Sequence, residues 1–296
     1  MADLAYAAIM AVWGSSFAVL RGLMGNSSAS PLALVSVRMA MAIALLTGFL
    51  VATPKGRAHL RALRGSVLRD GVLCGGLLGV GFLLQIEGLQ RTTASRSGFL
   101  TGLLVVMTPL LEFVLFRRRP PWPVLAGVAL AFGGMTLLSA PWADASTATL
   151  PGDWLTVGCA IVFAGHIIAL GRLAPRHPVP PMLLLQLATV CALAAIFGPL
   201  VEAQHFASDQ PRLWLALLYL ALFATLVAFG VQTWAQKTLP PVRIALISSL
   251  EPVFAALWAA LLIGERMTAR ELLGGALIVL GVAVGEAGAA WARARA

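Results

Sequence analysis

A small number of residues that can titrate lie inside long apolar stretches of this chain. His166 and Glu251 are the two that could carry a proton there. An imidazole titrates close to neutral pH, and a carboxylate at the centre of a membrane span costs at least about 2.5 kcal/mol on insertion scales. Pro252 follows Glu251, and its missing N–H breaks the helical hydrogen-bond ladder. A broken helix beside a carboxylate is typical of a transport site, although a structural hydrogen bond explains either residue equally well.

Aromatic and hydroxyl side chains accompany these groups at helical spacing. Trp13 and Phe17 are four residues apart and share a helix face, as do Phe82 and Gln85 at a spacing of three. We expect an apolar wall with sparse polar points, made by Trp13, Ser16, Phe17, Phe82, Gln85, Thr101, Phe163, His166 and Ser248. Such a wall would accept small molecules with apolar or aromatic groups. The alternatives are a lipid-facing Trp13 and plain interhelical hydrogen bonds for the polar members.

Two further charges, Arg38 and Glu112, also fall within apolar segments. Charges inside a membrane usually face the protein interior and pair with one another. The sequence therefore suggests a structural ion pair between them.

The elements that must position these residues are membrane-spanning helices. Hydrophobic residues make up 59% of the 296 residues and charged residues only 11%, whereas a soluble domain has about 25% charged residues. A spanning helix needs about 20 mostly apolar residues. Such segments start near Leu4, Leu32, Val67, Ala94, Trp122, Trp154, Met182, Leu213, Val242 and Leu272. We therefore predict an all-α polytopic membrane protein with ten transmembrane helices and no soluble domain, embedded in the lipid bilayer.

The distribution of positive charge predicts the orientation of these helices. The net charge is +9, but the basic residues cluster in alternate loops rather than on one nucleic-acid-binding face. With the N-terminus inside, 14 of the 20 loop and tail Lys and Arg residues lie on the cytoplasmic side. The positive-inside rule then places both termini in the cytoplasm. No nucleic-acid partner is expected.

Several kinds of chemistry lack their sequence signatures. Cys74, Cys159 and Cys191 are widely spaced within predicted spans, which favours neither a disulfide framework nor a metal site. The chain has no G-x-x-x-x-G-K-[ST] loop, no H-E-x-x-H and no G-x-S-x-G. We expect no cofactor, no metal and no catalytic residue. A membrane-embedded enzyme and a channel remain alternatives: an enzyme would alter its substrate covalently, and a channel would show linear flux.

The second half of the chain repeats the first at an offset of about 150 residues. Pro31-Leu32 matches Pro181-Met182, Gly127 matches Gly274, and Gly134 matches Gly281. We expect a first five-helix repeat over residues 1–140 and a second over 150–296. Because five is odd, the second copy would enter the membrane from the opposite side. Inverted repeats are typical of secondary transporters, whose substrate site lies between the halves.

Short motifs give the chain a family resemblance. Trp13-Gly14-Ser15-Ser16-Phe17, Gln90-Arg91-Thr92-Thr93-Ala94-Ser95, Ser249-Leu250-Glu251-Pro252-Val253-Phe254-Ala255-Ala256-Leu257 and Gly264-Glu265-Arg266-Met267-Thr268 stand at the expected places. With these, the sequence resembles the drug/metabolite transporter superfamily of the EamA type, and within it the amino-acid and aromatic amino-acid exporters of bacterial inner membranes. One departure is Pro109, which lies about one turn beyond the position matching Pro252.

The resemblance implies a function and a mechanism. It implies export of small metabolites by alternating access, with spans one, three, four, six, eight and nine around a central cavity and spans five and ten at the periphery. Amino acids are the expected substrates, and nucleosides, cationic compounds and other drugs are the alternatives. Transport could run down a concentration gradient or couple to protons through His166 or Glu251. We expect a monomer or a homodimer in the inner membrane.

Overall fold

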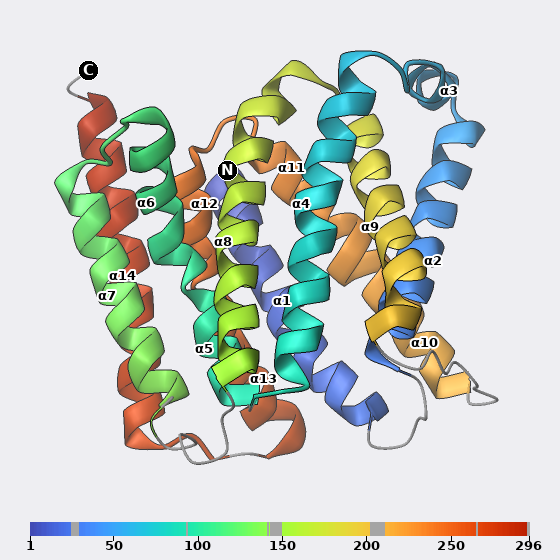
Figure 1. Ribbon diagram of the computed structural model, residues 1–296. Coiled ribbons are helices and arrows are strands. Elements are labelled where there is room, and N and C mark those ends of the chain that lie inside the picture. The colour runs from blue at the N-terminus through green and yellow to red at the C-terminus, as the bar shows by residue number, and fades with distance from the viewer. Residues whose placement is uncertain are drawn as a thin grey trace.

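The computed structural model describes residues 1–24, 30–92, 94–140, 142, 150–201, 211–264 and 266–294, and within these ranges it contains helices and no strands. The α-helices are α1 Ala2–Met24, α2 Pro31–Ala52, α3 Pro54–Arg61, α4 Ser66–Leu89, α5 Ala94–Gly102, α6 Leu104–Phe116, α7 Trp122–Ser139, α8 Leu150–Leu173, α9 Val179–Val201, α10 Pro211–Tyr219, α11 Ala228–Ala235, α12 Pro241–Ser248, α13 Glu251–Ile263 and α14 Ala269–Ala294. A 3₁₀ turn, η1, covers Ala174–Arg176, and a π-helical segment, η2, covers Leu220–Val227. The predicted all-α class is confirmed (Figure 1).

Nine helical segments of the described chain are long and apolar enough to cross a membrane. They run from α2 to α14, and consecutive helices such as α5 with α6, or α12 with α13, form single spans. The protein is therefore a multi-pass membrane protein. The predicted first span corresponds to α1, which has 23 residues and thus sufficient length, but it is not among the nine. The count of ten spans stays a prediction.

Two spans are interrupted at equivalent points. The fourth predicted span breaks at Leu103, between α5 and α6, and the ninth breaks at Ser249 and Leu250, between α12 and α13. Pro252 lies in the first turn of α13, where the missing N–H costs no helical hydrogen bond. Pro109 lies inside α6 and does not set the break in that span. The two halves thus share the interruption although their prolines differ in position.

Helices α7 and α14 form a seam in which the two backbones touch. A Cβ atom on Gly127 would lie 2.5 Å from the carbonyl oxygen of Gly281, and one on Gly281 would lie 2.6 Å from that of Gly127. Gly134 and Gly274 meet in the same reciprocal way, at 2.5 and 2.7 Å. The order of these contacts makes the two helices antiparallel. The seam lies at one flank of the bundle (Figure 1), which confirms the predicted peripheral place of these glycines.

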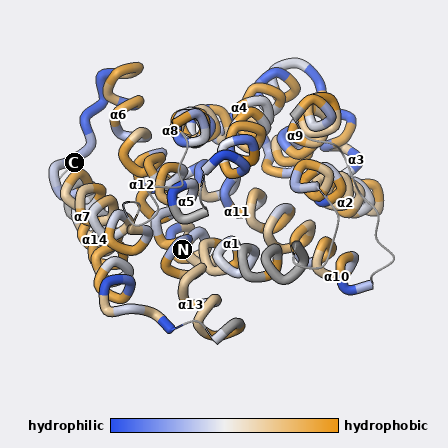
Figure 2. Tube along the Cα trace, turned by 60° about the horizontal axis from the view of Figure 1, so that its bottom comes forward, coloured by the Kyte–Doolittle hydropathy of each residue, from blue (hydrophilic) through white to orange (hydrophobic). Residues whose placement is uncertain are grey.

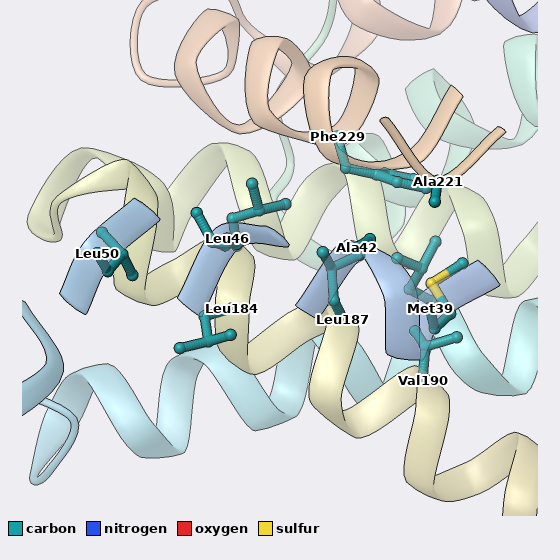
Figure 3. Packing of buried hydrophobic residues seen from close by; sticks show 11 residues of the cluster. Met39, Ala42, Leu46, Leu50, Leu184, Leu187, Val190, Ala221 and Phe229 are labelled. Atoms are coloured by element: carbon teal, nitrogen blue, oxygen red, sulfur yellow. The ribbon is translucent and has the colours of Figure 1, made fainter. Parts of the chain in front are cut away.

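The opposite flank is packed through large side chains. Met39, Ala42, Leu46 and Leu50 of α2 interlock with Leu184, Leu187 and Val190 of α9, and Ala221 and Phe229 close the cluster from above in Figure 3. Most of the helical trace is hydrophobic (Figure 2), and many large apolar side chains are exposed, including Leu200 and Leu261, which are 78% and 74% exposed. An apolar exterior of this kind is suited to contact with lipid tails.

The two termini lie toward the same end of the bundle (Figure 1). The short helix α3 and the connection between α6 and α7 lie at that end as well. These connections carry Lys55, Arg57, Arg61 and the Arg117–Arg119 run. The basic loops that the sequence assigns to one side are therefore gathered at one end of the molecule.

Candidate functional site

Trp13 of α1 is the centre of an aromatic cluster contributed by four helices. Its ring lies 6.4 Å from that of Tyr6 and 5.3 Å from that of Phe229, between centroids. Phe82 then lies 6.3 Å from Phe229 and 5.7 Å from Phe163 in edge-to-face geometry. Such geometries are favourable for aromatic pairs. Three of the predicted wall residues, Trp13, Phe82 and Phe163, are thus brought together, and all three side chains are partly exposed.

A wide helical turn anchors the Trp13 indole. Trp13 Nε1 donates to the carbonyl oxygen of Ala224 at 2.8 Å, within the π-helical segment η2. The N–H of Ala228 donates to the carbonyls of Phe223 and Thr225 rather than to that of Ala224. The Ala224 carbonyl therefore lacks its usual helical donor, and the indole N–H takes that place. Wide turns of this type are frequent at functional sites.

A glycine sets the position of Phe163. A Cβ atom on Gly81 would lie 2.2 Å from the Phe163 ring, so only glycine lets this ring pack against α4 beside Phe82. One turn further along α4, the Gln85 amide lies 3.5 Å from the Thr101 hydroxyl of α5. Gln85 and Thr101, two of the predicted polar residues of the site, are thus neighbours joined by a long hydrogen bond.

Arg38 of α2 projects its guanidinium toward the aromatic cluster. Its carbon Cζ lies 5.8 Å from the centroid of the Phe82 ring. Its Nε is buried without a hydrogen-bond partner, and no ion pair joins the side chain to any residue that the structure describes. The suggested pair with Glu112 is wrong, because Glu112 lies on α6 under the electrostatic influence of Arg172 and Arg118 instead.

His166 is the most completely enclosed of the predicted site residues. Its side chain is only 2% exposed, and Nε2 lies 3.0 Å from Oε1 of Gln186. The Gln186 amide nitrogen donates to the Met182 carbonyl and to the Thr233 hydroxyl, each at 3.3 Å. The amide oxygen is therefore the acceptor and His166 Nε2 the donor. This network supplies the structural role that the sequence left as an alternative.

Ser248 and Glu251 lie on either side of the break in the ninth span. The Ser248 hydroxyl donates to the Ile244 carbonyl at 2.9 Å, so the Tyr6 hydroxyl donates to Ser248, at 2.8 Å. Glu251 begins α13, is partly exposed, and is close enough to Tyr6 to act on it electrostatically. Within the described chain its carboxylate makes neither a hydrogen bond nor an ion pair.

The remaining predicted residues of span one have simpler surroundings. The Ser16 hydroxyl donates to the Trp13 carbonyl at 2.6 Å in its own helix. The side chain of Phe17 lies outside the described residues. Gly14 is pressed against α13, since a Cβ atom there would lie 2.7 Å from the Ala255 nitrogen. Close contact between α1 and α13 therefore holds Trp13 near the interrupted span.

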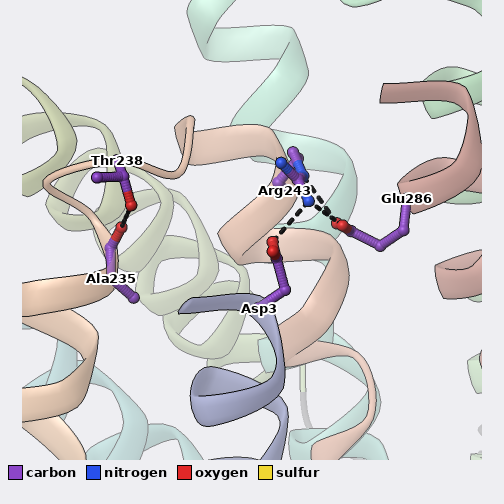
Figure 4. A network of polar contacts seen from close by, with 5 residues as sticks. All are labelled: Asp3, Ala235, Thr238, Arg243 and Glu286. Atoms are coloured by element: carbon purple, nitrogen blue, oxygen red, sulfur yellow. Dashed lines mark hydrogen bonds and ion pairs between the residues drawn. The ribbon is translucent and has the colours of Figure 1, made fainter. Parts of the chain in front are cut away.

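An ion-pair network (Figure 4) lies at the end of the bundle that carries the termini (Figure 1). Arg243 at the start of α12 pairs with Asp3 of α1 at 2.5 Å, and with Glu286 of α14. The Arg243 side chain is only 5% exposed. This network connects the start of an interrupted span to the first helix of the other half.

A matching ion pair lies at the opposite end of the bundle. Arg96 of α5 pairs with Asp153 of α8 at 2.5 Å, and the Thr92 hydroxyl donates to the same carboxylate at 2.8 Å. Asp153 follows Asp3 by 150 residues, and Arg243 follows Arg96 by 147 residues. The two ion pairs are therefore equivalent under the repeat offset.

Sequence reasoning missed Tyr6, Phe229 and the Ala224 carbonyl. Tyr6 lies seven residues before Trp13 and so on the same helix face, which was a readable signal. Neither Phe229 nor Ala224 stands in a motif. No characteristic residue type marks the π-helical turn that presents the Ala224 carbonyl. Across the described ranges, no three His, Cys, Asp or Glu side chains gather as metal ligands.

Comparison with known proteins finds a family model that covers both halves of the chain. The model of the EamA-like transporter family matches residues 1–140 and 150–284. An uncharacterized transporter of Archaeoglobus fulgidus is 30% identical over 96% of this chain and 85% of its own length. A "probable amino-acid metabolite efflux pump" of Escherichia coli is 27% identical over 97% and 95%. The uncharacterized inner membrane transporter YedA of the same species is 26% identical over 93% and 87%.

A solved crystal structure shares the fold. It superposes with a TM-score of 0.81 over 96% of both chains, at 19% identity. The family match covers nearly the whole chain, and the relatives named above are transporters and an efflux pump, not enzymes. The chain belongs to the EamA-like transporter family.

Proposed function

We propose that this transporter exports small metabolites, foremost amino acids with apolar or aromatic side chains, by alternating access. The observation that carries the proposal is the aromatic cluster around Trp13, which lies beside the interrupted ninth span. Interrupted helices are where secondary transporters place their substrates. A similar efflux pump of E. coli bears an amino-acid name, which supports the same substrate class.

The aromatic cluster suits a tolerant binding wall. Trp13, Phe82 and Phe163 offer rings that are partly exposed although they lie among helices, while Gln85, Thr101 and Ser248 offer a few polar atoms. Binding sites for small molecules are mostly apolar, with few orienting polar groups. We assign substrate contact to these residues, with Ser16, Phe17 and His166 as further candidates from the sequence.

Alternating access is supported by three equivalences between the halves. The fourth and ninth spans are interrupted at matching points. Helices α7 and α14, which match under the repeat, run antiparallel and exchange equivalent glycine contacts. The ion pairs Asp3–Arg243 and Asp153–Arg96 match as well, and lie at opposite ends. An inverted repeat with one closing contact at each end is the arrangement that this mechanism needs.

Glu251 is the better of the two candidates for proton coupling. His166 is buried and engaged with Gln186, whereas Glu251 is partly exposed and has no hydrogen-bond partner in the described chain. Facilitated diffusion without any ion is the alternative. We place the protein in the inner membrane, as its relative YedA is named, with both termini cytoplasmic because the basic loops share their end of the bundle.

Counterflow in proteoliposomes tests the proposal. Vesicles loaded with unlabelled phenylalanine should accumulate labelled phenylalanine, leucine and tryptophan transiently, and the flux should saturate. A nucleoside and an organic cation serve as comparison substrates. Counterflow of those compounds but of no amino acid would replace the proposed substrate class, and flux that rises linearly without saturation would point to a channel.

A further inference from the structure

We propose that Arg38 is the point in the substrate site that recognises a carboxylate. The inference rests on the proposed function and deepens it, because it commits the transporter to substrates that carry an acidic group next to an apolar or aromatic one. Arg38 lies in α2, which the sequence resemblance does not place at the cavity, so nothing above assigns it a substrate role.

The position of Arg38 joins it to the aromatic wall. Its guanidinium carbon lies 5.8 Å from the Phe82 ring centroid, and Phe82 contacts both Phe163 and Phe229. A group bound to this guanidinium would therefore lie beside the Phe82 ring, at the edge of the aromatic cluster. An amino acid with an aromatic side chain has a carboxylate and a ring at such a separation.

The second observation is that Arg38 has neither an acceptor for its buried Nε atom nor an acidic partner in the described chain. A charged side chain inside a membrane span is costly and normally pairs within the protein. Buried polar groups without a partner are uncommon and need an explanation. A substrate carboxylate supplies both the charge and the acceptors, because a guanidinium binds carboxylates through two parallel hydrogen bonds.

Arg172 differs from Arg38 in its charge environment, although its Nε and Nη2 atoms are also buried without a hydrogen-bond partner. It lies in the last turn of α8, with its Cζ 3.2 Å from the Phe116 ring centroid, and Glu112 lies near enough to interact with it electrostatically. Arg172 thus has both a stacking partner and an acid in its surroundings. The variant R172Q is a matched control for loss of a guanidinium from a spanning helix.

Transport of phenylalanine and of phenylalanine amide separates the effect of Arg38 from general damage. Both compounds have the same ring and amine, and only the first has a carboxylate. The wild type should prefer phenylalanine, and R38Q should reduce the ratio of the two rates by about 10- to 100-fold, as expected for loss of a hydrogen-bonded charge. R38K keeps the positive charge but loses the two parallel N–H donors of the guanidinium, so its ratio of phenylalanine to amide transport should be intermediate. R172Q should keep the wild-type ratio.

The outcomes are distinct. A wild type that moves no amino acid overturns the proposed function. If it moves phenylalanine, then equal transport of the amide by the wild type, or an unchanged ratio in R38Q, overturns the role of Arg38 alone. If R38Q does not fold, as judged by size-exclusion chromatography, the ratio in R38K decides: a wild-type ratio overturns the proposal, and a reduced ratio supports it.

Discussion

Arg96 and Asp153 join α5 to α8 through an ion pair of 2.5 Å at the end of the bundle opposite the termini. Their counterparts Arg243 and Asp3 join α12 to α1 at the other end, also at 2.5 Å. Each pair thus connects the first segment of an interrupted span to the first helix of the other half. The end that opens during transport would have to lose its pair.

Neutralising one pair should therefore shift the protein toward one open state. We expect D153N to favour the state open at the end opposite the termini, and D3N to favour the reverse. With a pair worth roughly 1.4 kcal/mol, the ratio of the two states would change about tenfold. The measurement is alkylation of T101C by an impermeant reagent from each side, in a background without the three native cysteines. Equal accessibility in D153N and D3N would contradict the gating role.

Trp13 should matter both for its ring and for its indole N–H. W13A removes the ring contacts with Tyr6 and Phe229, so counterflow of aromatic amino acids should fall strongly while expression is unchanged. W13F keeps a ring but cannot donate to the Ala224 carbonyl, and loss of one hydrogen bond costs about 1 kcal/mol, or roughly fivefold. Unchanged counterflow in W13A would remove Trp13 from the site.

Neutral variants of Glu251 and His166 test coupling to protons. If Glu251 carries the coupling proton, E251Q should abolish the dependence of net export on pH but leave exchange of substrate for substrate intact, because exchange needs only the movement of the loaded carrier. H166Q should keep the pH profile and lower stability through the lost contact with Gln186. Should both variants show the wild-type pH profile, facilitated diffusion is the better description.

The α7–α14 seam should be sensitive to any side chain added at its glycines. A side chain on Gly134 would collide with the carbonyl oxygen of Gly274 and the nitrogen of Ile278, at 2.5 and 2.7 Å. G134V should therefore destabilise the protein by about 1–3 kcal/mol. The neighbouring Gly133 has nothing within 4 Å of an added Cβ, so G133V is the matched control. Thermal unfolding in detergent measures the difference, and equal melting temperatures would refute the close contact.

The all-α, multi-pass class could be predicted from the sequence because the length of its apolar segments is visible there, whereas the count of ten spans stays a prediction. The offset matched Gly127 with Gly274 and Gly134 with Gly281 as equivalent positions, but only the structure shows that Gly127 contacts Gly281 and Gly134 contacts Gly274. The aromatic site was readable only in part. Trp13 stands in a motif, but its partner Ala224 is a carbonyl presented by a π-helical turn, which leaves no trace in residue type. The suggested Arg38–Glu112 pair failed because charge alone does not tell which helices become neighbours.

The glycine seam also determines where the molecule can bend. Two helices whose backbones touch at two reciprocal glycine contacts cannot slide past one another without steric collision. Helices α7 and α14 are therefore suited to stay fixed relative to one another while the rest of the protein moves. The opposite flank, where α2 and α9 meet through long Met and Leu side chains, can change its packing more easily. We expect a cross-link between α7 and α14 to leave transport intact, whereas one between α2 and α9 should stop it. The transporter would then open at the flank where α2 meets α9, while the flank where α7 meets α14 stays closed.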